Sequence, residues 1–171
     1  FIYLERRYQG MPTEQQPTMY FKYRGTFDQK KLMQGIQQWF VDNGYKFHAS
    51  KYKIKASEAE YEANGEREIT EFVKYWISIH MWIRDLFDVE VIQDGEKKKM
   101  QEGYIQLDIS GKLELDYTGR FGGTKFTQWL YDFYHKYVIR QTIKDVWEDD
   151  IILKMQELES KIKDLIGVEV S

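Results

Sequence analysis

The stretch that decides the fold runs from Val73 to Arg84 and reads VKYWISIHMWIR. Its side chains alternate in character with a period of two, which is typical of a β-strand. One face carries Val73, Tyr75, Ile77, Ile79, Met81 and Ile83. The opposite face carries Lys74, Trp76, Ser78, His80, Trp82 and Arg84. We therefore expect a long strand in an antiparallel sheet that is buried on one face and exposed to solvent on the other.

Other segments repeat this alternation before and after the strand. Residues 19–26 and residues 104–117 both alternate apolar with polar side chains, which predicts two more strands. A change of phase in the pattern predicts a bulge near Ala49-Ser50. Asn64-Gly65 and Asp94-Gly95 predict hairpin turns, because Asn, Asp and Gly tolerate positive φ angles.

Two helical patterns accompany the strands. Asp28 can cap a helix whose apolar stripe runs from Leu32 to Phe40, and Asn43-Gly44 is a typical stop. A second pattern begins at Thr124 and continues to Ile166. Unbroken, that helix would be about 64 Å long, whereas a domain of this length is only about 40 Å across. We therefore expect a break between Val138 and Asp150. The alternative is a helix whose end projects from the domain and is buried against a coiled partner or in a dimer.

The elements predict a single α+β domain over residues 18–166, with a helical extension from about residue 142. Residues 1–17 contain two prolines and a glycine, so we expect an irregular N-terminal arm there. The arm begins with apolar residues and is either a loose terminus or a segment that docks on a neighbouring subunit. Residues 167–171 are expected to form a short C-terminal tail.

The order strand, helix, antiparallel meander and long C-terminal helix resembles the helix-grip fold of START-like and Bet v1-like proteins. Thr26-Phe27-Asp28, Trp39 and Gly44-Tyr45 fit the first strand and helix of such a domain. The phrases at residues 89–91, 94–99, 115–117 and 120–121 also resemble small uncharacterised archaeal proteins with this element order. The resemblance implies a curved sheet packed on a long C-terminal helix, a short helix after the first strand, and often an apolar cavity between sheet and helix. It implies no particular activity.

The composition excludes several classes of protein. The chain has 171 residues, no cysteine and a formal net charge of −3. It therefore has no disulfide framework, no thiolate nucleophile and no Cys-ligated metal site, and its charge does not favour general nucleic-acid binding. No run of residues fits a membrane span, and no signal peptide is visible. We expect a soluble protein, intracellular or within an assembled particle.

The chain shows no catalytic motif. It lacks a Gly-x-Ser-x-Gly elbow and a Walker loop, so we expect no enzyme activity. His48, His80 and His135 lie on separate elements without paired ligand spacing, so no metal or cofactor is predicted. Glu58, Glu60 and Glu62 share one strand face, and a solvated edge is expected there. Arg120 in the glycine-rich loop before the last helical pattern is a candidate for holding an anion, and Lys125 at the start of that pattern could assist it.

Aromatic residues make up 16% of the chain and suggest two functions. The first is a non-enzymatic interaction or structural subunit of a larger assembly, formed with a protein partner or by self-association. Its interface candidates are Phe1, Tyr3, Trp76, Trp82 and Trp147. The alternative is a carrier for an apolar or aromatic small molecule or lipid. Its pocket candidates are Tyr75, Ile77, Ile79, Met81, Ile105, Leu107, Ile109, Trp129, Phe133 and Tyr137.

Overall fold

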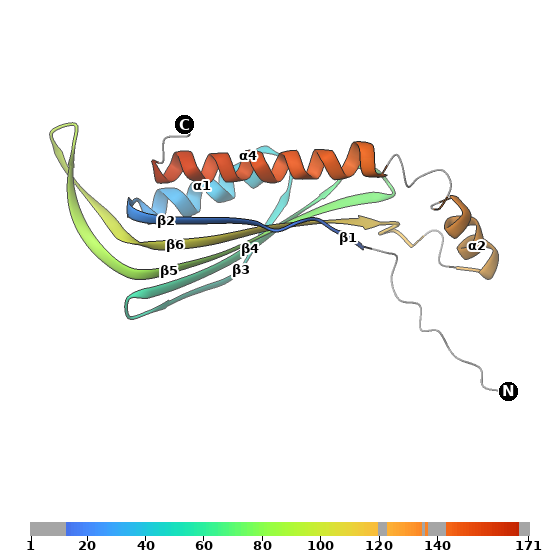
Figure 1. The fold of residues 1–171 in the computed structure, drawn as a ribbon, viewed down its shortest axis with the longest axis horizontal. Coiled ribbons are helices and arrows are strands. Elements are labelled where there is room, and N and C mark those ends of the chain that lie inside the picture. Colours follow the sequence, from blue (N-terminus) through green and yellow to red (C-terminus); the bar gives the residue numbers. More distant parts are fainter. Residues whose placement is uncertain (1–12, 120–122, 135, 137–142, 168–171) are drawn as a thin grey trace.

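The chain folds as an α+β structure around a curved, antiparallel, six-stranded sheet (Figure 1). The computed structural model describes residues 13–119, 123–134, 136 and 143–167. The strands are β1 (Thr13–Gln15), β2 (Met19–Phe27), β3 (Lys46–Lys55), β4 (Glu58–Glu68), β5 (Val73–Gln93) and β6 (Glu96–Leu115). The helices are α1 (Gln29–Asp42), α2 (Lys125–Tyr134) and α4 (Asp149–Ile166), the last preceded by a π-helical turn, η2 (Ile143–Glu148).

The four strands from β3 to β6 form a meander in chain order, and β1 and β2 both pair with the outer side of β6. Thr13 lies opposite Glu114, and Met19 lies opposite Ile109. The prediction of an irregular arm up to residue 17 is therefore wrong for Thr13–Gln15. These three residues add a short strand to β6, and Pro17, which has no N–H to donate, lies outside this ladder.

The predicted strand at Val73–Arg84 is confirmed as the first half of β5, with its apolar face buried. The hairpin turn at Asp94-Gly95 is also confirmed, since these residues join β5 to β6. The hairpin predicted at Asn64-Gly65 is wrong, because both residues lie within β4. A Cβ atom at Gly65 would collide with the ring of Phe40, so this glycine serves close packing of α1 on the sheet.

Two irregularities shape the sheet. The register of β3 against β4 shifts between Ala49 and Lys51, which confirms the predicted bulge. The register of β5 against β6 shifts between Arg84 and Phe87, where Asp85 has a φ of 52°. Bulges increase the local twist of a strand. The β5–β6 hairpin curls beyond this second shift toward the side of the sheet that carries α1 and α4 (Figure 1).

Helix α1 begins and ends where the sequence predicts. The backbone N–H of Lys31 donates to Oδ1 of Asp28 at 3.0 Å, so Asp28 is the N-cap. Gly44 follows the helix with a φ of +76°, a conformation that glycine adopts without strain. Leu32, Ile36 and Phe40 are fully buried against the sheet and α4.

Helix α4 packs on the same face of the sheet as α1 (Figure 1). Its apolar stripe is buried and consists of Ile151, Met155, Leu158, Ile162 and Ile166. A Cβ atom at Gly111 of β6 would lie 2.6 Å from Sδ of Met155, so helix and strand are in direct contact. The hydroxyl of Tyr75 on β5 donates to Oδ2 of Asp150 at 2.9 Å. Burial and the hydrogen bond to Asp150 raise the pKa of Tyr75. The same hydrogen bond links β5 to the start of α4.

Helix α2 does not continue straight into α4. It lies beyond the end of the sheet, apart from the two helices that cover it (Figure 1). This separation confirms that the C-terminal pattern does not form one unbroken helix, although residues 137–142 lie outside the described residues. The C-terminal helix that covers the sheet is therefore α4 rather than α2.

Candidate functional site

The face of the sheet opposite α1 and α4 carries polar and aromatic side chains, and we call it the open face. These side chains alternate with those of the core and are half-buried, because each is covered mainly by its neighbours on adjacent strands. On the central strands they are Glu60, Glu62, Asn64, Glu66, Lys74, Trp76, Ser78, His80, Trp82, Gln106, Asp108, Ser110, Lys112 and Glu114. None of the described helices lies over this face in Figure 1.

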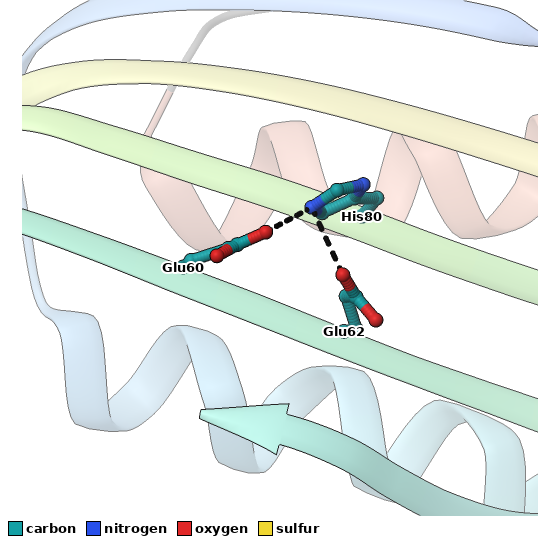
Figure 2. Close-up of side chains that lie close together, drawn as sticks. All are labelled: Glu60, Glu62 and His80. Carbon is teal, nitrogen blue, oxygen red and sulfur yellow. Dashed lines mark hydrogen bonds and ion pairs between the residues drawn. The ribbon is translucent and has the colours of Figure 1, made fainter. Parts of the chain in front are cut away.

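Three side chains on β4 and β5 converge at the centre of the open face. Nε2 of His80 lies 2.9 Å from Oε1 of Glu60 and 3.3 Å from Oε1 of Glu62. Figure 2 shows both carboxylates directed at this one ring nitrogen. The strand register explains the cluster, since His80 lies directly opposite Glu62, and Glu60 is the next residue on that face.

Lys51 on β3 joins the cluster from the other side. Its Nζ lies 2.7 Å from Oε2 of Glu60 and 3.5 Å from Oε1 of Glu62. Hydrogen bonds from Lys51 and then from His80 lower the pKa of Glu60. In return, the hydrogen bond to Glu60 raises the pKa of Lys51. The two carboxylates are thus shared between an ammonium and an imidazole.

The His80 ring is held from the side and faces a hollow. The Trp82 ring lies against it with centroids 3.5 Å apart. Asp108 on β6 lies directly opposite His80, and its Oδ1 is buried without a hydrogen-bond partner. Glu62, His80 and Asp108 border an open hollow of about 440 Å³, whose other walls are mainly polar: Thr18, Tyr20, Ser50, Ala63, Asn64, Ser78, Ile79 and Ser110.

Sequence reasoning missed this cluster. We expected the histidines to lie apart and Glu60 and Glu62 to lie on a solvated edge, but β4 is flanked by β3 and β5. His80 instead lies beside both carboxylates, although it shares no element with the other histidines. Two carboxylates spaced i, i+2 on one strand were a visible signal. The strand register that brings His80 beside them could not be predicted from the sequence, because strand pairing is a tertiary property. His135 lies outside the described residues.

The aromatic interface candidates have different surroundings. Trp76 on the open face is held in place, because its Nε1 donates to Oε2 of Glu114 at 2.6 Å. The ammonium groups of Lys74 and Lys112 lie 5.7 and 5.0 Å from its ring centroid. Trp82 lies on His80, and Trp147 is partly buried against the core. Phe1 and Tyr3 lie outside the described residues.

The pocket candidates separate into two groups. Seven belong to the buried core beneath α1 and α4: Tyr75, Ile77, Ile79, Met81, Ile105, Leu107 and Ile109. The prediction that Trp129 and Phe133 face them is wrong, since these side chains are 59% and 48% exposed. The stripe of α4 takes their place over the sheet. Tyr137 lies outside the described residues.

Helix α2 instead presents an apolar stripe to solvent, which we call the α2 stripe. It consists of Phe126, Trp129, Leu130 and Phe133, spaced i, i+3, i+4 and i+7. The three aromatic rings stack in a row, with centroids 6.1 and 5.8 Å apart. On the other side of α2, Tyr131 is buried and lies against Phe72 with ring centroids 6.1 Å apart.

The structure does not bring the two anion candidates, Arg120 and Lys125, together in a described site. Lys125 is exposed at the first residue of α2, and Arg120 lies outside the described residues. The start of α2 is capped by Thr124, whose Oγ1 accepts from the backbone N–H of Thr127 at 3.2 Å. This hydrogen bond makes Thr124 the N-cap of α2, at the residue where the sequence predicts the helical pattern to begin.

Comparison of the chain with protein-family models and with curated proteins finds no match. Among the described residues, no helix has both the length and the apolar character that crossing a membrane requires.

Proposed function

We propose that this protein is a non-enzymatic structural subunit that associates with a second copy of itself through α2. The observation that carries the proposal is the exposed α2 stripe. Leu130 is 38% exposed and Phe126 is 66% exposed, with Trp129 and Phe133 between these values. An amphipathic helix whose apolar face points to solvent is a recurring docking element, and aromatic side chains are enriched where binding energy concentrates.

The charges beside the α2 stripe favour an antiparallel pair of helices. Lys125 and Asp132 are seven residues apart, so both flank the same side of the stripe. When two α2 helices pack antiparallel about a two-fold axis, Lys125 of each copy comes beside Asp132 of the other. One pair of opposite charges thus forms twice, as expected for an isologous interface. In a parallel pair the same flank of the two helices lies on opposite sides of the seam, so Lys125 and Asp132 of the two copies would not meet.

The area of the α2 stripe agrees with a weak dimer. Aromatic side chains bury about 150–250 Å² each, so the partly exposed stripe offers on the order of 450 Å² per copy. Two copies would bury roughly 900 Å², which is at the low end for specific interfaces. We expect a dissociation constant on the order of micromolar. The near-balanced charge of the helix does not favour an anionic membrane surface as the occupant.

We further propose that the body of the protein is a helix-grip domain of the START-like kind that acts as a scaffold for α2. The support is the strand order β2-β6-β5-β4-β3 together with a C-terminal helix laid across the sheet. In this proposal α4 packs directly on the sheet, with Met155 in contact with the backbone at Gly111. The space between helix and sheet is therefore filled by side chains and does not serve as a carrier cavity.

Sedimentation velocity over a concentration series from about 1 to about 200 µM tests the self-association. We expect the wild-type protein to shift from monomer to dimer across this range. Trp129→Ala should weaken the dimer by at least about tenfold, because it removes the central side chain of the stripe. Leu153→Ala is the matched control, since Leu153 is an exposed apolar residue on α4. A monomer at all concentrations, or equal effects of both substitutions, would contradict the proposal.

A further inference from the structure

We propose that Glu60, Glu62 and His80 form a binding site for one divalent transition-metal ion, with Zn²⁺ as the ion that fits best. The site lies on the open face, whereas self-association is assigned to α2 beyond the end of the sheet (Figures 1 and 2). It therefore adds a binding activity that is independent of the proposed dimer.

The distances among the three groups suit tetrahedral coordination. One ligand atom from each residue lies within 4.8 Å of the other two. With bonds of about 2.0–2.1 Å, the ligand atoms of a tetrahedral zinc site are about 3.3 Å apart. Nε2 of His80 is 2.9 Å from Oε1 of Glu60 and 3.3 Å from Oε1 of Glu62, so small side-chain adjustments suffice.

The imidazole can donate a hydrogen bond to only one of the two carboxylates at a time. Nε2 of His80 carries at most one proton, yet two carboxylate oxygens are directed at it (Figure 2). Lys51 Nζ contacts both carboxylates as well. A cation bound between Glu60, Glu62 and His80 would satisfy both carboxylates at once. In its absence the ammonium of Lys51 supplies part of that positive charge, and because the side chain is long and partly exposed, it can move aside.

An independent observation comes from β6. Asp108 is the direct cross-strand neighbour of His80, and its buried Oδ1 has no hydrogen-bond partner. Histidines that bind a metal commonly donate their other ring N–H to a carboxylate. With Nε2 on the metal, Nδ1 of His80 carries the proton, and we expect it to donate to Oδ1 of Asp108 on the neighbouring strand. The Trp82 ring against the imidazole limits rotation of the ligand.

The ligand set selects the class of metal. Imidazole nitrogen with carboxylate oxygen suits Zn²⁺ and its neighbours in the first transition row, whereas Mg²⁺ and Ca²⁺ prefer oxygen ligands alone. Three protein ligands leave a fourth position open, as in catalytic rather than structural zinc sites. Because Glu62 and His80 border the 440 Å³ hollow, that position can be filled by water from this side.

Isothermal titration with Zn²⁺ at constant neutral pH tests the site. We expect the wild-type chain to bind one Zn²⁺, and His80→Gln and Glu62→Gln to weaken binding by at least about tenfold. Lys51→Met should tighten binding by about tenfold, because it removes a positive charge a few ångströms from the ion. Mg²⁺ in excess should not compete.

Two variants serve as matched controls. Glu66→Gln removes a carboxylate from the same face of β4, where it pairs with Lys74 at 3.6 Å. Lys53→Met removes a positive charge from β3 opposite Glu60, and no described ion pair joins these two residues. Both should change the affinity less than about threefold, because no described ion pair joins either side chain to the three ligands and the exposed ammonium of Lys53 is screened by salt.

The outcomes are decisive even if one variant fails to fold. Loss of binding in His80→Gln and gain in Lys51→Met support the site separately. Absence of one-to-one Zn²⁺ binding in both wild type and Lys51→Met would overturn it, as would binding that survives both ligand substitutions. Sedimentation velocity of the same samples measures dimer formation, so failure of the zinc site can be distinguished from failure of the dimer proposal.

Discussion

Helices α2 and α4 carry similar apolar stripes, yet only one of them is buried. The α4 stripe, from Ile151 to Ile166, lies against the sheet and α1 with at most 5% exposure. The α2 stripe lies at the end of the sheet with 38–66% of each side chain exposed. An apolar stripe therefore indicates that a helix has a partner surface, but it does not say which one. In α4 the partner is in the same chain, and in α2 we propose that it is a second copy.

The largest contrast should appear when one side chain is removed from each stripe. Leu158→Ala on α4 is expected to lower the free energy of unfolding by about 2–5 kcal/mol, because it leaves a cavity in a fully buried site. Trp129→Ala on α2 should change it by no more than about 0.5 kcal/mol at monomer concentrations. Urea unfolding followed by circular dichroism measures both. Equal losses would mean that α2 belongs to the core after all.

The next contrast concerns how closely each helix approaches its neighbours. Gly111→Ala should lower the free energy of unfolding by about 1–3 kcal/mol, since the added Cβ would lie 2.6 Å from Sδ of Met155. Gly123→Ala, just before α2, is the control because nothing lies within 4 Å of its Cβ. Urea unfolding of the double variant Gly111→Ala, Met155→Ala should show a loss smaller than the sum of the single losses. Strict additivity would show that the contact is not tight.

The helix caps give a smaller contrast with a dependence on pH. Asp28→Ala should lower the free energy of unfolding by about 1 kcal/mol near pH 7, because it removes the cap of α1. Thr124→Ala removes the cap of α2 and should leave global unfolding unchanged. The hydrogen bond from Lys31, with help from Lys98, lowers the pKa of Asp28 below 3.8.

The sign of the pH effect follows from that lowered pKa. The stabilisation by Asp28 is present above the unfolded value near 3.8 and is lost as the pH falls through the folded value. The difference between wild type and Asp28→Ala should therefore shrink in acid. Urea titrations at several pH values measure this difference, and a gap that grows on acidification would contradict the assigned cap.

Much of the fold could be predicted because the sequence patterns that indicate it involve residues close together in the chain. The alternation at Val73–Arg84, the Asp28 cap and the Asn43-Gly44 stop depend on residues close in sequence, and all are confirmed. The Asn64-Gly65 hairpin was wrong because a glycine can serve close packing as well as a turn. Gly65 lies within β4 and makes room for Phe40, a contact that only the tertiary structure defines.

The candidate sites were less predictable for the same reason. Trp129 and Phe133 have the spacing of core residues, and nothing local distinguishes their stripe from that of α4. The cluster of Glu60, Glu62 and His80 depends on the register of β4 against β5, which the sequence does not encode in a readable pattern. Long-range geometry, rather than residue type, defines both surfaces.

The central claim is that the α2 stripe binds a second copy in antiparallel orientation, and exchange of its flanking charges tests this most directly. Sedimentation should show that Lys125→Asp and Asp132→Lys each weaken the dimer, because each places like charges side by side twice. The double variant Lys125→Asp, Asp132→Lys should restore dimerisation to near the wild-type level. A double variant as weak as the single variants, or dimerisation indifferent to all three, would contradict the account.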